Sequence, residues 1–338
     1  MSALTATRGM TLTGNIDDYP EGIIIPIDKP YRWTSADVIR KVKYQAIRHF
    51  SKKNLKVGHA GTLDPLATGV LLVCIGKATK LAEELQKHEK QYLAGVTFGA
   101  TTPSYDLEKE VDRMYPLEGV TQEALEAVLP SFIGPQEQIA PLFSAKSVDG
   151  VRAYEMARKL YRQAQRDGGD FDHSASELLS KQNIVISEMQ LVSYTSSGEV
   201  APQTTASLRS APPIASDGPL PLMMPRPRGD ESKHFDACDP SSRALARREA
   251  QVASGATSPE ERVNEKSGRI HVADVSGLDL PQAEILVTCS KGTYIRALAR
   301  DLGESLGSGA FLHSLRRTRN GGFRVEDALT VDEVMDLL

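Results

Sequence analysis

The chain has 338 residues, of which 40% are apolar and 25% charged, and its formal net charge is −4 at pH 7. These proportions are typical of a soluble globular protein, with one large domain or about two smaller ones. No apolar run approaches the ~18 residues of a membrane-spanning helix, the N-terminus lacks a secretory signal, and the three cysteines show no metal-ligand spacing. We therefore expect a cytoplasmic protein with no membrane segment, disulfide or bound metal.

The first half of the chain predicts alternating strands and helices. Residues 22–28 have the apolar, β-branched composition of a strand. A helix should begin near Ser35, because Thr34 and Asp37 have the spacing of a capping box. Its buried face should carry Val38, Val42 and Ala46. Further strands are predicted over 70–75 and 92–98, and further helices over 79–88, 121–131 and 152–166.

The second half continues the mixture. Strands are predicted over 184–194 and 283–290, and helices over 294–306 and 330–338. Because no regular βαβ repeat appears, we favour an α+β fold with a mixed sheet over a doubly wound fold. We expect a flexible tail over 1–20 and one folded domain built from 21–201 and 260–329.

Residues 202–259 break the pattern. This segment holds nine of the nineteen prolines, is rich in Ser and Ala, and has no sustained periodicity. Such a composition buries too little apolar surface to offset the entropy cost of ordering. We expect a disordered insert, whose role the sequence does not reveal.

The most informative segment is Gly58-His-Ala-Gly-Thr-Leu-Asp-Pro-Leu-Ala-Thr-Gly69. It places one carboxylate, Asp64, in a glycine-rich turn ahead of the apolar run 70–75. Pro65 disfavours a helical backbone at Asp64, so the carboxylate should lie on a stiff, extended bend. An ordinary turn before a buried strand is the alternative interpretation.

This segment resembles the GHxGxLDPxAxG motif of TruB-type tRNA pseudouridine synthases. Four more segments resemble motifs of that family, in the same order, and with the first they extend over most of the chain outside the insert. They are Asp28-Lys-Pro-Tyr-Arg-Trp-Thr-Ser35, Lys90-Gln-Tyr-Leu93, Cys289-Ser-Lys-Gly-Thr-Tyr-Ile-Arg-Ala297, and Leu315-Arg-Arg317 followed by a Gly-Gly-Phe ending at Phe323.

The resemblance implies a pseudouridine-synthase fold: a bent, mixed but largely antiparallel sheet with flanking helices and a central active-site cleft. It implies isomerisation of the T-loop uridine of tRNA (position 55 in tRNA numbering) to pseudouridine, without a cofactor. The tRNA T arm is the implied partner, and we expect a monomer with no obligatory protein partner. Because the sequence stops at Leu338, we expect a short bacterial-type enzyme without the RNA-binding PUA domain of some relatives.

The resemblance also assigns catalytic roles. Asp64 is the expected nucleophile or base, and attack at uracil C6, attack at ribose C1′ and removal of the 2′ proton all stay open. Tyr92 is expected to stack on the target base, although a strand tyrosine can also simply pack in the core. Arg296 is expected to pair with Asp64, since an opposite charge favours an ionised carboxylate.

Four more residues are expected to bind the RNA or shape the site. Tyr294 and Leu315 should line the pocket around the base. His59 should enter the space that the extruded uridine leaves, although a lone histidine is usually an ordinary loop residue. Lys29 should either buttress the loop of Asp64 or touch the RNA backbone.

Two positions depart from the family pattern. Arg32 stands where the DKPxG motif has Gly, so this turn must avoid a positive φ or tolerate strain. Ser147 stands where the family has Lys, while Lys146 lies one residue early, which in a strand would put its side chain on the other face.

Basic runs offer a local RNA-binding face in spite of the negative net charge. They are Lys41, Lys43, Arg48, Lys52, Lys53 and Lys56 before the Asp64 loop, and Arg316, Arg317 and Arg319 near the end. The alternative function is a tRNA-binding or tRNA-folding factor whose catalysis is dispensable, because opening the T arm is part of base extrusion.

Overall fold

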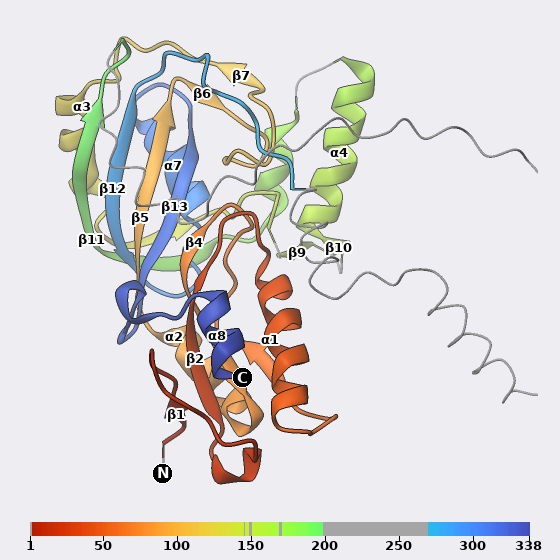
Figure 1. The fold of residues 1–338 in the computed structure, drawn as a ribbon. Coiled ribbons are helices and arrows are strands. Elements are labelled where there is room, and N and C mark those ends of the chain that lie inside the picture. Colours follow the sequence, from red (N-terminus) through yellow and green to blue (C-terminus); the bar gives the residue numbers. More distant parts are fainter. Residues whose placement is uncertain (1, 145, 149–150, 169–170, 199–269) are drawn as a thin grey trace, which may run out of the picture.

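The structure is a computed structural model that describes residues 2–144, 146–148, 151–168, 171–198 and 270–338 (Figure 1). The expected insert at 202–259 therefore lies outside the described residues. The strands are β1 (Leu4–Thr5), β2 (Ile23–Lys29), β3 (Val57–His59), β4 (Thr68–Ile75), β5 (Lys90–Phe98), β6 (Ala100–Thr101), β7 (Arg113–Met114), β8 (Gly134–Gln138), β9 (Ser147–Val148), β10 (Val151–Arg152), β11 (Gln182–Thr195), β12 (Gln282–Cys289), β13 (Ala310–Asn320) and β14 (Phe323–Arg324).

The described helices agree with the predicted ones to within a few residues at most ends. The α-helices are α1 (Ser35–His49), α2 (Ala82–Lys87), α3 (Gln122–Val128), α4 (Ala153–Asp167), α7 (Ile295–Ser305) and α8 (Val331–Leu337). The 3-10 helices are η1 (Ile16–Asp18), η2 (Gly76–Leu81), η3 (Leu129–Phe132), η4 (His173–Leu178) and η6 (Val325–Asp327).

One mixed sheet runs through the molecule in the order β1-β2-β4-β13-β5-β12-β11-β8, with β3 beside β4 and β14 beside β13. Most neighbours are antiparallel, but β1 pairs with β2 and β13 with β4 in parallel. The β4–β13 pairing consists of only two registered positions, Arg316 with Thr68 and Arg317 with Gly69. The sheet bends at this narrow join, which separates the two halves seen in Figure 1. The predicted α+β fold with a bent, largely antiparallel mixed sheet is confirmed.

Helices cover the sheet with the faces that their periodicity predicts. Val38, Val42 and Ala46 of α1 are all fully buried. The predicted capping box of α1 is present, with the Thr34 hydroxyl accepting from the Asp37 amide and the Asp37 carboxylate accepting from the Thr34 amide. In the other half, α7 packs against β5 and β13 (Figure 1).

The expected flexible tail over 1–20 is wrong for residues 2–20. Leu4 and Thr5 form β1 on the edge of the sheet, and Ala6, Leu12 and Ile16 are buried in the core. These scattered apolar residues lack periodicity, so no local pattern indicated their packing. Strand β13 was likewise not predicted, because the arginine-rich sequence of its second half hides the strand pattern, although none of its residues is exposed.

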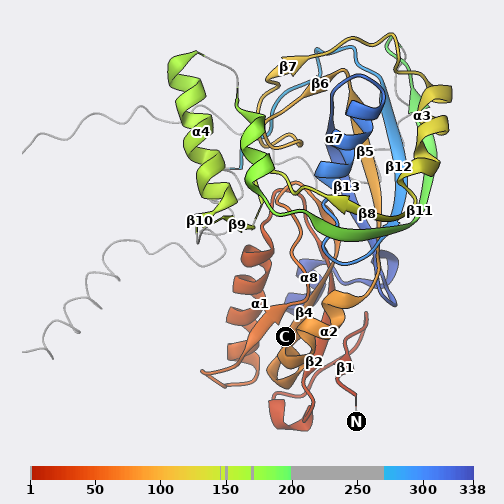
Figure 2. The same ribbon diagram turned by 180° about the vertical axis from the view of Figure 1, so that it is seen from behind.

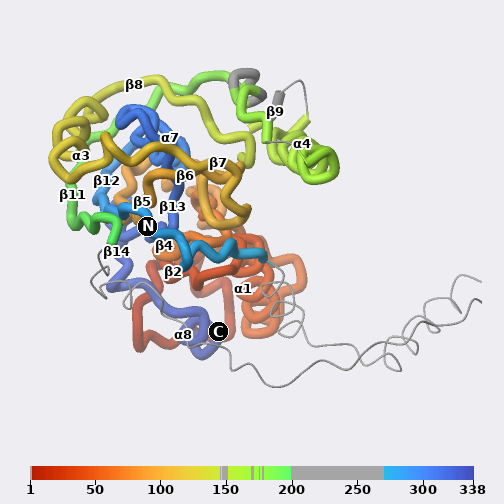
Figure 3. The backbone as a smooth tube through the Cα atoms, turned by 90° about the horizontal axis from the view of Figure 1, so that it is seen from above, coloured from red at the N-terminus to blue at the C-terminus, as the bar shows by residue number. Residues whose placement is uncertain are grey.

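Helix α4 projects beyond the sheet on the side away from α3, as the view from above shows (Figure 3). Among the described residues, no helix is long and apolar enough to cross a membrane.

Candidate active site

Asp64 lies on the loop between β3 and β4, at the join of the two halves. The hydroxyl of Ser35, at the start of α1, accepts from the Leu63 amide at 2.9 Å and donates to the Leu63 carbonyl at 3.1 Å. The Asp64 carbonyl accepts from the Ala67 amide at 3.1 Å. These bonds fix the backbone on both sides of the carboxylate.

Arg317 of β13 holds the same loop from the opposite strand. Its side chain is buried and donates to the carbonyl oxygens of Gly61, Thr62 and Val70 at 3.3, 3.4 and 2.7 Å. A Cβ on Gly69 (φ +98°) would come within 2.2 Å of the Arg317 carbonyl oxygen. The join therefore requires both a buried guanidinium and a glycine.

Arg317 is thus unavailable for the RNA contact that the basic run near the end suggested, and that expectation is wrong for this residue. The sequence shows only that it is a cation, whereas burial depends on the distant strand beside it. The neighbouring cations Arg316 and Arg319 are ion-paired, with Asp28 at 2.8 Å and with Glu89 at 3.4 Å.

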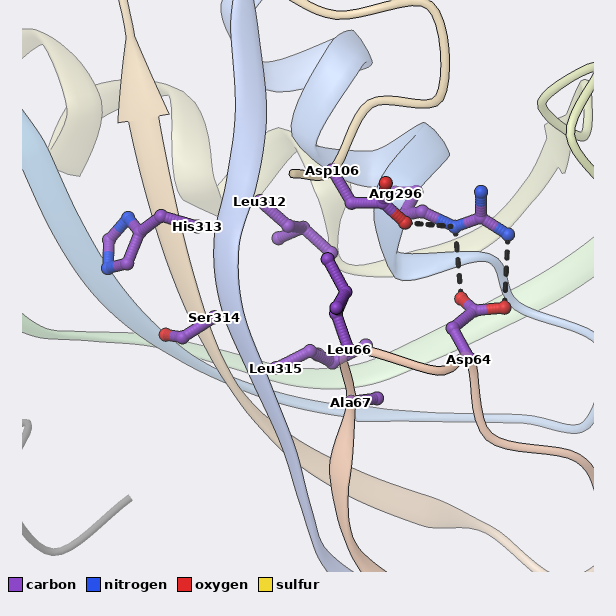
Figure 4. A pocket seen from close by; sticks show the side chains of 9 residues that line it. All are labelled: Asp64, Leu66, Ala67, Asp106, Arg296, Leu312, His313, Ser314 and Leu315. Carbon is purple, nitrogen blue, oxygen red and sulfur yellow. Dashed lines mark hydrogen bonds and ion pairs between the residues drawn. The ribbon is translucent and has the colours of Figure 1, made fainter. Parts of the chain in front are cut away.

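Arg296, in the first turn of α7, pairs with Asp64 through two parallel hydrogen bonds (Figure 4). Its Nε donates to Asp64 Oδ2 at 2.9 Å and its Nη2 to Asp64 Oδ1 at 3.1 Å. It also donates to the carbonyl oxygens of Ser104 and Phe143, at 3.1 and 2.9 Å. The guanidinium side chain is only 6% exposed, whereas that of Asp64 is 37% exposed. A buried arginine held by four hydrogen bonds therefore orients a carboxylate that still faces the cleft.

Two carboxyl groups that sequence reasoning missed, those of Asp106 and Glu108, lie near this pair, and Glu108 also lines the cleft. Asp106 Oδ2 is 3.6 Å from Arg296 Nε (Figure 4). Burial raises the pKa of Asp106, against the opposing effect of Arg296. Burial and the neighbouring Asp106 raise the pKa of Glu108 to about 7. Burial lowers the pKa of Arg296, but Asp64, Asp106 and Glu108 more than offset that effect, so its pKa is raised. The only local sign of these two groups in the sequence was that Asp106 and Glu108 are separated by one residue, a pattern that is common on protein surfaces.

The cleft in front of Asp64 has a volume of about 520 Å³ and brings together five of the seven predicted site residues: Asp64, Tyr92, Tyr294, Arg296 and Leu315. Tyr92 is only 8% exposed, and burial raises its pKa, as it does that of Tyr294. The Gln138 side chain accepts from the Tyr294 amide at 2.9 Å and donates to the Tyr294 carbonyl at 3.2 Å. Aromatic and aliphatic walls around one oriented carboxylate suit a flat ring.

The other two predicted residues, Lys29 and His59, do not line this cleft. Lys29 is fully buried, and its ammonium donates to the carbonyl oxygens of Pro30, Trp33 and Pro65 at 3.0, 2.5 and 3.2 Å. Burial lowers the pKa of Lys29 to about 7, with nearby Asp64 acting in the opposite direction. This geometry favours the buttress interpretation of Lys29 over contact with the RNA backbone.

His59 ends β3, opposite Val73 of β4. Its ring is half-buried, and its Nδ1 is buried without a hydrogen-bond partner. Burial, and after it the charge of Arg317, lower the pKa of His59. The predicted role of His59 is to enter the space that the extruded uridine leaves. The ring lies at the start of the Asp64 loop but does not line the cleft.

Of the two departures, Arg32 takes the strained alternative, with φ +63°. Its Nη2 donates to the Ile270 carbonyl oxygen at 2.8 Å, so the substituted side chain ties this turn to a distant segment. Ser147 lies in β9 opposite Arg152.

Within the described ranges, no three His, Cys, Asp or Glu side chains converge where they could hold a metal ion.

Two family models match the chain. The model for the TruB family pseudouridylate synthase N-terminal domain matches residues 48–168, and the model for the tRNA pseudouridylate synthase B C-terminal domain matches residues 296–338. The first includes Asp64 and Tyr92, and the second begins at Arg296.

Curated relatives match over almost the whole chain. The tRNA pseudouridine synthase B of Phocaeicola vulgatus is 37% identical over 321 residues, which are 95% of this chain and 95% of the relative. That of Bacteroides thetaiotaomicron is 38% identical over 312 residues, 92% of this chain and 91% of the relative. Among solved structures, a Cbf5-Nop10-Gar1 complex matches with a TM-score of 0.49 and 18% identity, covering 99% of this chain and 60% of the matched chain.

Proposed function

This chain belongs to the TruB family of pseudouridylate synthases, and from that premise we propose that it converts a uridine of tRNA to pseudouridine. The observation that carries the proposal is the Asp64–Arg296 pair at the base of the cleft, with its two hydrogen bonds of 2.9 and 3.1 Å. The relatives that match 95% of both chains carry the name tRNA pseudouridine synthase B, which supports tRNA as the substrate.

The reaction is an isomerisation that this site can perform with its own side chains. The bond between uracil N1 and ribose C1′ breaks, and a bond between uracil C5 and C1′ forms. The hydrogen on C5 leaves as a proton, and N1 gains a proton. Nothing is oxidised or reduced, so the chemistry needs an oriented carboxylate and a pocket that keeps the detached base from escaping.

We assign the carboxylate role to Asp64, because its side chain is partly exposed to the cleft while Arg296 fixes its direction. The first step is attack at C6, attack at C1′ or removal of the 2′ proton. Tyr92 is proposed to stack on the extruded base, with Tyr294 and Leu315 completing the wall. Lys29 and Arg317 are proposed to position Asp64 indirectly, by holding its loop, since both donate hydrogen bonds to backbone carbonyl oxygens of that loop.

The finer statements follow from the same premise. We propose that the target is the T-loop uridine at position 55, extruded from the folded arm at a cost of a few kcal/mol. We propose a cytoplasmic monomer. Its catalytic domain is formed by 21–201 and 260–329, together with residues 2–20, which contribute β1 and buried core residues, and with the buried face of α8 (Val331, Val334 and Leu337). His59 is proposed to fill the space that the extruded base leaves.

The test is release of tritium from a tRNA transcript labelled at uridine C5, because forming the C5 glycoside must expel that hydrogen. Asp64→Asn should keep tRNA binding but reduce release by ~10²–10⁴-fold, the typical cost of removing a catalytic acid–base group. Asp336→Asn, an exposed carboxylate on α8, is the control and should release tritium at the wild-type rate.

Full turnover by Asp64→Asn would overturn the assignment of the carboxylate. No release from a folded wild-type protein that binds tRNA would overturn the synthase activity and leave the tRNA-folding factor as the function.

A further inference from the structure

A second cavity, of about 470 Å³, lies where the N-terminal turn, the α1–β3 connection and the β4–η2 turn meet. It shares no lining residue with the cleft around Asp64. Four lysines contribute to its wall: Lys52, Lys56, Lys77 and Lys80. We call it the lysine cavity.

The lysines of this cavity exceed the carboxylates around it. Lys52 Nζ is 3.2 Å from Asp17 Oδ1, and Lys77 Nζ is 3.8 Å from Glu21 Oε1. Lys56 and Lys80 are exposed and make no ion pair with any residue that the structure describes. Two positive charges are therefore left to attract an anion, in a protein whose overall charge is negative.

The wall also contains a fixed aromatic ring. Tyr19 is half-buried, its hydroxyl accepts from the Thr13 amide at 2.7 Å, and its ring packs edge-on against Phe50 with the centroids 6.1 Å apart. Cations beside an aromatic ring are the usual combination for a nucleic-acid strand, in which phosphates meet the cations and bases or sugars meet the ring.

One continuous helical segment connects the lysine cavity to the catalytic cleft. Lys77 and Lys80 lie on η2, which runs directly into α2, and Gln86 of α2 lines the cleft. The rise from residue 80 to residue 86 is about 10 Å. In Figure 2, α2 lies in the lower half of the molecule, below the bend of the sheet. A strand of RNA in the cleft can therefore reach the cavity along this segment.

The cavity also adjoins the strand that leads to the catalytic loop. Lys56 directly precedes β3, and the Thr79 Cγ2 atom lies 3.9 Å from the position of a Cβ on Gly58. An anion held here would be bound next to the segment that carries His59 and continues to Asp64.

We propose that the lysine cavity binds backbone phosphates of the tRNA outside the T stem-loop, as a second contact beside the catalytic cleft. The inference rests on the proposed function, because it assumes that the T stem-loop occupies the cleft. A tRNA bound across both sites would place its phosphates along the η2–α2 segment, where Lys77 and Lys80 lie. It would also pass the exposed wall that carries Lys56. Lys56 and Lys80 are the residues expected to make these contacts.

The test compares the wild type with a Lys56→Ala and Lys80→Ala double variant, on a full-length tRNA transcript and on an isolated T-arm hairpin, over a range of KCl concentrations. For full-length tRNA, the double variant should bind about tenfold more weakly and lose about 1.5 from the slope of log K against log salt, since each phosphate contact contributes ~0.7–0.9. Binding of the hairpin should not change. Lys181→Ala with Arg324→Ala removes two exposed cations outside the cavity, of which Lys181 is ion-paired with Glu137, and controls for the loss of two positive charges.

An unchanged affinity and slope for full-length tRNA would overturn the inference. An equal loss on the hairpin would also overturn it, because the lysines would then act on the T arm or through their general field. A titration with inorganic tripolyphosphate tests the third outcome. If the wild type binds tripolyphosphate tightly, the double variant does not, and both bind tRNA equally well, the inference is overturned and the cavity is a site for a small anion. Binding is the readout, so tritium release by the wild type tests the proposed function separately.

Discussion

The catalytic cleft and the lysine cavity use charge in opposite ways. In the cleft, Arg296 is buried and lies next to two carboxylates, and it donates hydrogen bonds to Asp64 and to the carbonyl oxygens of Ser104 and Phe143. In the lysine cavity, Lys56 and Lys80 are exposed, and no described residue pairs with them. A buried pair fixes geometry and is costly to break, whereas exposed cations contribute salt-dependent affinity and little to folding.

Replacing Arg296 should give the largest effect, because it leaves Asp64 and Asp106 facing each other without a cation. Arg296→Met should lower the free energy of unfolding by about 3–5 kcal/mol and abolish tritium release. Denaturant unfolding measures the first and the C5-tritium assay the second. Arg40→Met removes an exposed partner of Asp37 and should change stability by less than about 1 kcal/mol.

If Arg296→Met does not fold, Arg296→Lys keeps the charge but cannot form the two parallel hydrogen bonds. It should fold and still lose most activity. Wild-type turnover in a folded Arg296→Lys would show that the orientation of Asp64 does not depend on the guanidinium.

The join between β4 and β13 should be nearly as sensitive, although it carries no catalytic group. Gly69→Ala should lower the free energy of unfolding by about 2–4 kcal/mol, since the new Cβ would meet the Arg317 backbone at 2.2 Å in addition to the strain of a positive φ. Gly134→Ala is the matched control: its φ is +113° with nothing within 4 Å of the new Cβ, so it measures the strain alone. Equal losses in the two variants would mean that the join can open to accept a methyl group.

The smallest effect should come from Glu108, and it should depend on pH. The pKa of Glu108 is raised in the folded protein from 4.5 to about 7, so the folded state binds more protons than the unfolded state between those values. Its contribution to stability is therefore complete below pH 4.5 and is lost as pH rises through 7. The stability of the wild type relative to Glu108→Gln should fall by about 1–2 kcal/mol between about pH 5.5 and pH 7.

Thermal unfolding of both proteins across this pH range measures the difference. Glu118→Gln removes an exposed carboxylate and corrects for the loss of one negative charge. A difference between wild type and Glu108→Gln that stays constant with pH would show that Glu108 is not protonated in the folded cleft.

Sequence reasoning located the Asp64 loop, five residues of the cleft and most of the regular elements, because these depend on patterns within short segments. The capping box at Thr34 and the buried face of α1 are encoded within four or eight residues. The bend at Asp64 follows from Pro65 and the nearby glycines, two of which have positive φ. The family motifs then assigned Tyr92 and Arg296 to the same site.

Contacts between distant segments were decided only by the tertiary structure. Arg317 and Lys29 are basic residues in the sequence, and only the strands and turns around them make them buried supports of the Asp64 loop. Asp106 and Glu108 gain their role from Arg296, which is almost 200 residues away. Leu4 and Thr5 join the sheet because β2 offers them an edge. The sequence by itself determines which local conformations are low in free energy and which side chains are reactive. Burial and charge pairing depend on which distant segments come into contact in the tertiary structure.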